Sequence, residues 1–123
     1  MREIKFRAWD KEEQEMLDWD KFFNLDIAQV FESKGSWGVY PMQYTGLTDK
    51  NGVEIYEGDI VETVYNGEVF AGVVVYDLSE VDFKVTDGKE KYGRNFQYLA
   101  GNDENEVIGN IYETPELLES KKD

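Results

Sequence analysis

The sequence contains no histidine and no cysteine. Without cysteine it forms no disulfide bond and no thiolate metal site. Without histidine it lacks the commonest general base and metal ligand, and a serine–histidine mechanism is excluded. It also has no apolar run near the roughly 20 residues of a membrane helix, and its first residues lack the apolar stretch of a signal peptide. These absences predict a soluble, cytoplasmic protein that is not an enzyme, has no cofactor or metal, and does not enter membranes.

Basic residues are scarce. Thirteen lysines and arginines stand against 27 acidic residues, a formal net charge of −14. Nucleic-acid binding needs cations that displace counterions from phosphates, and none lies between Lys50 and Lys84, so direct binding to nucleic acid is disfavoured. The weaker alternative is a small composite patch from cations nearer the ends, namely Arg2, Lys5, Arg7, Lys11, Lys21, Lys89, Lys91 and Arg94. The acidic balance predicts a basic host or phage protein as partner.

The 123 residues, 41% of them hydrophobic, are enough for one folded domain over 1–123. We expect two lobes, 1–50 and 51–123, with a weak hinge at residues 33–36. Aromatic content of 15% is generous for one small core. The excess predicts a homo-oligomeric interface, and a ligand or sugar site is the alternative. The residues concerned are Trp9, Trp19, Trp37, Tyr40, Tyr44, Tyr56 and Tyr65.

Apolar periodicity predicts a mainly β fold, with α+β as the alternative. In the first lobe, Ile4, Phe6 and Ala8 alternate as in a strand, 16–19 returns, and 37–44 is extended, with Pro41 favouring an edge. Apolar residues at 23, 27, 30 and 31 share the face of one short helix. In the second lobe, strands are expected at 60–65, 68–76, 81–86, 93–99 and 107–112. They form a small SH3-like barrel or a bent antiparallel sheet, before a short helix that starts at Thr114-Pro115-Glu116.

Turn residues concentrate in one segment, 44–61. Asn51-Gly52 favours a type I′ hairpin turn with positive φ at both residues, and Glu57-Gly58-Asp59 is a second tight turn that uses glycine's freedom. We also expect Gly46 to lie in a turn, and Asn66-Gly67 to join two strands of a hairpin.

The run from Gln43 to Val61 resembles the signature of the YopX family. The matching motif comprises Tyr44, Gly46, Asp49, Asn51, Gly52, Ile55, Tyr56, Glu57, Gly58, Asp59 and Val61. The resemblance extends to the strand-like start, 1–10, and to a final segment, 107–118, that contains Gly109 and Asn110. It implies a small protein encoded by a bacteriophage or prophage, with no established activity and therefore no catalytic residues to assign. It also implies self-association.

Three interpretations of the site remain open. Glu54, Glu57 and Asp59 are brought together by a turn, and paired carboxylates would suit a small hydrolase or a sugar-binding module. Acids in tight turns more often bind backbone amides or face solvent. The oxygen-rich loop 102–106 predicts weak cation binding at most. We therefore expect a non-enzymatic, self-associating module that binds protein. A mimic of DNA that inhibits a host nucleic-acid-binding protein is the sharper alternative.

Overall fold

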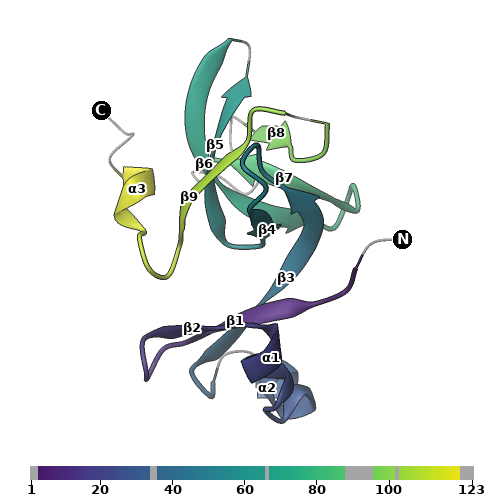
Figure 1. Ribbon diagram of the computed structural model, residues 1–123, viewed down its shortest axis with the longest axis vertical. Helices are drawn as coiled ribbons and strands as arrows, with labels where there is room; N and C mark the ends of the chain where they lie inside the picture. The colour runs from purple at the N-terminus through teal and green to yellow at the C-terminus, as the bar shows by residue number, and fades with distance from the viewer. Residues whose placement is uncertain (1–2, 34–35, 66, 88–95, 102, 120–123) are drawn as a thin grey trace.

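The computed structural model describes residues 3–33, 36–65, 67–87, 96–101 and 103–119. The fold is mainly β, as predicted, with two antiparallel sheets and a few short helices (Figure 1). The first sheet has the strand order β2-β1-β3-β4, and the second β8-β7-β6-β5-β9. The strands are β1 Phe6–Asp10, β2 Glu15–Leu17, β3 Val39–Thr48, β4 Glu54–Tyr56, β5 Asp59–Tyr65, β6 Glu68–Asp77, β7 Asp82–Thr86, β8 Phe96–Tyr98 and β9 Glu106–Asn110. The helices are α1 Trp19–Phe23, α2 Ile27–Ser33 and α3 Glu116–Glu119.

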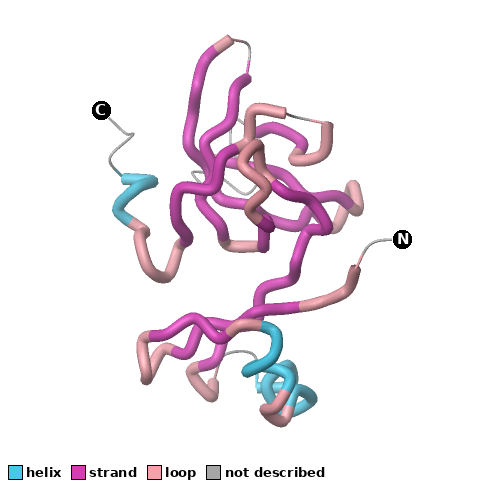
Figure 2. Tube along the Cα trace, viewed as in Figure 1, coloured by secondary structure: helices cyan, strands magenta, loops and turns pink. Residues whose placement is uncertain are grey.

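The short helix predicted for the first lobe is present as α2, which contains residues 27, 30 and 31, but Phe23 belongs to a separate helix, α1. The Asp18 carboxylate accepts the N–H of Lys21, which starts the first helix one residue later, at Trp19. Trp19 is therefore not the end of the returning strand. With α1 starting at Trp19, the side chain of Phe22 is fully buried and the side chain of Phe23 is exposed. Figure 2 shows both helices at the end of the first sheet that is remote from the second sheet.

Strand β3 connects the two halves of the molecule (Figure 1). Its first half pairs with β1, where Ala8 lies opposite Pro41, and its second half pairs with β4 from Tyr44 onward. Among the described residues, β3 thus pairs on one side only at Pro41, a local edge in a strand that has partners on both sides further on. In the second half, Ile55 of β4 packs into the core of the second sheet. Strand β4 thus contacts both halves of the molecule. The lobe boundary expected at residue 50 stays a prediction.

The second sheet is a half-barrel in which every predicted strand is present. The turn between β5 and β6 follows the expected hairpin: Tyr65 pairs with Glu68 and Gly67 has φ +80°. Asn66 lies outside the described residues, as do residues 93–95 of the predicted fourth strand. Of the predicted basic patch, Arg2, Lys89, Lys91 and Arg94 also lie outside them. The core contains Ile55, Val61, Val74, Phe83, Val85 and Leu99.

The type I′ turn predicted at Asn51-Gly52 is wrong. Gly52 has φ +84°, but Asn51 is not in the left-handed region. The Asp49 carboxylate accepts the N–H groups of Asn51 and Val53, and the Asp49 carbonyl accepts the N–H of Gly52. These bonds hold a longer loop in which only its last residue needs positive φ, the pattern of a three-residue hairpin.

Among the described residues, no helix combines the length and apolar character that a membrane crossing requires.

Candidate functional site

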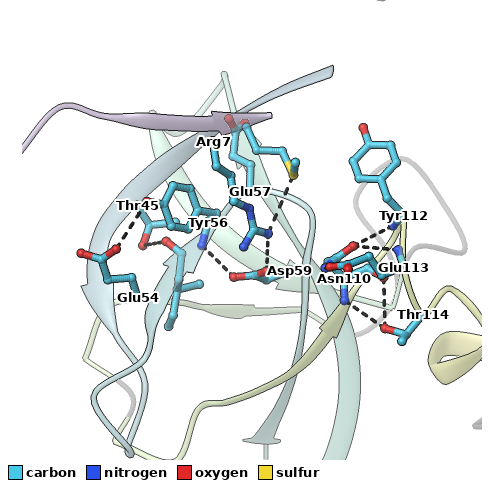
Figure 3. A network of polar contacts seen from close by, with 12 residues as sticks. Arg7, Thr45, Glu54, Tyr56, Glu57, Asp59, Asn110, Tyr112, Glu113 and Thr114 are labelled. Atoms are coloured by element: carbon cyan, nitrogen blue, oxygen red, sulfur yellow. Dashed lines mark hydrogen bonds and ion pairs between the residues drawn. The ribbon is translucent and has the colours of Figure 1, made fainter. Parts of the chain in front are cut away.

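Residues of the Gln43 to Val61 segment meet β1 where the two sheets join (Figure 3). Asp59, the first residue of β5, binds Arg7 of β1 through Oδ1 at 2.5 Å and accepts the N–H of Tyr56 through Oδ2 at 2.8 Å. The guanidinium also lies 4.6 Å from the centre of the Tyr56 ring. This buried ion pair joins residues 52 apart in the sequence and so fastens the first strand to the second sheet.

Burial raises the pKa of Asp59 above its ordinary value, and the nearby Arg7 and the Tyr56 N–H only partly offset this effect. Arg7 had been predicted as a member of the basic patch. Its side chain is instead 16% exposed and is engaged by a carboxylate that is almost fully buried. A cation in this position serves the junction and is not presented to a phosphate backbone.

The other two candidate acids have separate partners. Glu54 accepts a bond from Lys5 at 2.6 Å, and the ammonium group lies 4.9 Å from the centre of the Tyr44 ring. Glu57 accepts the backbone N–H of Gln43 at 2.9 Å. Since each of these acids, like Asp59, has its own binding partner, the arrangement favours the structural interpretation over an acid–base pair.

Asp49 links the loop after β3 to the last strand. Besides the two loop amides, its carboxylate accepts the N–H of Val107 in β9 through Oδ2, at 2.9 Å. Burial raises the pKa of this carboxyl, but the bonds from Val107, Val53 and Asn51 more than offset burial and hold the pKa below its ordinary value. The ionised form is therefore part of the fold.

Asn110 organises the turn after β9. Its Oδ1 accepts the N–H groups of Tyr112 and Glu113, and its Nδ2 donates to Glu113 at 2.7 Å. The Thr114 hydroxyl accepts the Asn110 N–H. Gly109 precedes this turn because a Cβ there would overlap the Thr114 hydroxyl. Gly109 and Asn110, which the family resemblance singled out, thus both contribute to the contacts of one turn.

The same turn places Tyr112 against the first sheet. Its ring packs nearly parallel to those of Trp9, at 5.9 Å and 12°, and Tyr40, at 5.6 Å and 21°. A groove of about 360 Å³ lies beside it. The groove is lined by Pro41, Met42, Glu57, Gly58, Val73, Val74, Val75, Tyr76, Ile111 and Tyr112. Its described walls are mostly apolar, as is common for pockets that bind ligands.

A second ionic cluster was missed by the sequence reasoning. Lys84 binds Asp77 at 2.8 Å and Glu80 at 2.7 Å, and its ammonium lies 5.2 Å from the Tyr98 ring centre. The bond with Asp77 raises the pKa of Lys84 and holds that of Asp77 well below its usual range. Lys84 is the first cation after Lys50 in the sequence. This isolated position, among many acids, was the available signal for the cluster. The cluster borders a pocket of about 520 Å³.

The remaining predictions have mixed outcomes. Trp9, Tyr44 and Tyr56 are buried, Trp19 and Tyr40 are half-buried, and Trp37 is exposed. The side chain of Tyr65 lies outside the described part. The homo-oligomer therefore stays a prediction. Within the described ranges, no three carboxylates are grouped so as to hold a metal ion, and Asn102 of the oxygen-rich loop lies outside those ranges.

Fold and junction together define a class: a mainly β protein in which a turn-rich central segment meets the first strand, and the Arg7–Asp59 ion pair ties two antiparallel sheets together. The chain belongs to the YopX protein family, whose model matches residues 5–119. Protein EF1440 from Enterococcus faecalis is 26% identical, with a TM-score of 0.57 over 96% of this chain and 99% of that one. YopX from Bacillus subtilis, at 19% identity, shares the fold with a TM-score of 0.51 over 92% and 96% of the two chains. None of the curated proteins matches the sequence.

Proposed function

We propose that this protein is a non-enzymatic, self-associating module whose acidic surface binds a basic protein partner. One observation carries the proposal: most lysines and arginines of the described chain form ion pairs with carboxylates of the same chain. Of the six lysines and arginines in the part of the chain that the structure describes, four are in ion pairs, and only Lys11 and Lys21 are not. The four pairs are Lys5–Glu54, Arg7–Asp59, Lys50–Glu106 and Lys84 with both Asp77 and Glu80.

The surface of the protein is therefore mainly negative. Each of these ion pairs engages a cation, so the excess of 14 negative charges in the whole sequence is carried largely by carboxylates that face solvent. Such a surface accelerates the approach of a basic partner and repels nucleic acid. The acids that would be needed for a hydrolase, Glu54, Glu57 and Asp59, are engaged by Lys5, the Gln43 amide and Arg7. These contacts support binding over catalysis.

The test starts with bacterial host lysate passed over the immobilised protein and eluted with rising salt. Each eluted protein is identified by mass spectrometry, purified and titrated against the module by calorimetry at low and high salt. A basic partner whose affinity falls as salt rises is the expected result. If no purified partner binds, or if binding is insensitive to salt, the proposal fails. Competition of the partner by DNA would identify the module as a mimic of nucleic acid.

Self-association is tested separately by sedimentation velocity over a range of protein concentrations. The proposal expects a defined oligomer whose proportion rises with concentration. A monomer at every concentration would overturn this half of the proposal and leave partner binding unaffected.

A further inference from the structure

We propose that the exposed face of helices α1 and α2 docks a partner segment in which lysines or arginines accompany apolar side chains. This inference rests on the proposed function, because it assigns the acidic binding activity to one surface. The face lies at the end of the first sheet away from the second sheet, where no other described element covers it (Figure 2).

The face is built on a set of rings that we call the aromatic cluster: Phe6, Trp19, Phe22, Phe23 and Phe31. Trp19 contacts Phe23, Phe22 and Phe6 at centre distances of 5.3, 6.2 and 6.1 Å. Phe31 contacts Phe6 at 5.2 Å and Phe22 at 6.1 Å. The five rings are therefore connected, from the first strand through both helices.

The cluster is buried at one end and open at the other. Phe22 is fully buried and Trp19 and Phe6 are half-buried, so the base is held by the core of the first sheet. Phe23 is 60% exposed, Phe31 41% and the neighbouring Leu25 40%. Single exposed apolar residues are ordinary on protein surfaces, but exposed rings that continue a packed cluster are typical of binding surfaces. A rigid base also means that little side-chain entropy is lost on docking.

Carboxylates surround these side chains in the sequence and on the surface. Asp18 and Asp20 lie at the start of α1, Asp26 lies between the helices and Glu32 lies in α2, and all four are exposed. Against these four acids, residues 18–33 supply one exposed cation, Lys21.

The charge decides which occupant fits. A second copy of this chain would bring the same carboxylates to the contact, and nucleic acid or an anionic membrane would likewise be repelled. A neutral apolar segment would bury the rings but leave the surrounding carboxylates without partners. A basic, amphipathic segment satisfies both features, with its apolar side chains on Phe23, Leu25 and Phe31 and its cations on the acids.

The test uses a synthetic helical peptide of lysine and leucine with one apolar face as the probe. Amide shifts of the protein are followed by NMR during titration, and affinity is measured by calorimetry. We expect the shifts to concentrate on residues 19–33 and the affinity to fall with salt. Peptides with glutamate in place of lysine, or alanine in place of leucine, serve as controls and should bind at least about tenfold more weakly.

Two variants address the two features of the surface. Phe23→Ala removes the most exposed ring, and Asp20→Lys/Glu32→Lys reverses two acids while leaving the capping residues Asp18 and Asp26 intact. Each should weaken the peptide about tenfold. Their controls are Leu78→Ala, which removes an exposed apolar side chain from the other half of the molecule, and Glu68→Lys/Asp103→Lys, which makes the same change in net charge there. Both controls should bind like the unmodified protein.

The outcomes separate the two proposals. Shifts located elsewhere, or equal weakening by the remote charge variant, would overturn this inference while leaving an acidic binding module in place. Equal binding of the glutamate peptide would overturn the charge argument itself. If the peptide does not bind but lysate partners do, the assignment to this face is wrong. If neither binds, the proposed function is wrong as well.

Discussion

Gly58 provides the sharpest test of how the junction is built. The residue has φ +85°, and its backbone is fixed on both sides: its N–H donates to Val74 of β6, and its carbonyl accepts the N–H of Ile111. A Cβ at this position would lie 3.2 Å from Sδ of Met42 and 3.7 Å from Cγ1 of Ile111. The turn therefore cannot relax toward negative φ without breaking bonds to two other segments.

We expect Gly58→Val to lower the free energy of unfolding by about 3 kcal/mol. Left-handed backbone costs an L-residue about 1–2 kcal/mol, and overpacking against Met42 adds about 1–3 kcal/mol. For a chain of this size, that loss lowers Tm by about 10 °C. Urea unfolding followed by tryptophan fluorescence measures the change, with thermal unfolding by circular dichroism as the second readout.

Gly52 supplies a matched control for the backbone effect alone. It has nearly the same φ, +84°, but no atom lies within 4 Å of the position of its Cβ. Gly52→Ala is therefore expected to cost about 1 kcal/mol, and Gly58→Ala more. A Gly58→Val protein as stable as the unmodified one, or a Gly52→Ala protein that is equally destabilised, would refute the reasoning from crowding and fixed bonds.

Three further perturbations test the polar contacts. Arg7→Met leaves Asp59 buried without its cation and should cost about 3 kcal/mol in urea unfolding at pH 7, whereas Arg7→Met/Asp59→Asn should recover much of the loss; an Arg7→Met protein of unchanged stability would contradict the role of the pair. The pKa of Asp49 is depressed in the fold, so its stabilisation is complete above the ordinary value of about 4 and is lost as pH falls through the lower, folded value. The stability difference between the unmodified protein and Asp49→Asn should accordingly shrink below about pH 4, and a difference constant from pH 6 to pH 2 would rule this out. Gly109→Ala should lower Tm by several degrees because its Cβ overlaps the Thr114 hydroxyl, and unchanged amide shifts in residues 109–114 would argue against that overlap.

Local patterns were enough to predict the class of fold and the positions of its strands. Alternation of apolar residues located β1 and the strands of the second sheet, and Gly58 and Gly67 adopt the positive φ that their turns required. Gly46 also has positive φ, +87°, but the turn expected there is wrong, because Gly46 lies inside β3. These features depend on neighbours in the sequence, since period and turn geometry are set within a few residues. The same holds for the helix start at Pro115, which precedes α3.

Long-range partners were beyond such patterns. Asp49 binds an amide 58 residues away, and that bond, with two local ones, replaced the expected turn at Asn51 by a longer loop. Arg7 was assigned to a basic surface because nothing near it in the sequence identifies Asp59 as its partner. A carboxylate or a cation has no intrinsic preference for one distant partner, so only the packing of the sheets selects it.

The sequence by itself therefore determined the β-rich fold, the acidic balance and the family segment from Gln43 to Val61. The tertiary structure decided which charges form buried ion pairs and which face solvent. Asp59 is buried and therefore needs Arg7 as its partner, whereas Asp20 and Glu32 are exposed to solvent. It also decided that the rings of Phe6, Trp19 and Phe31 join into one cluster, since contacts between a strand and two helices form only when the sheet and helices pack together.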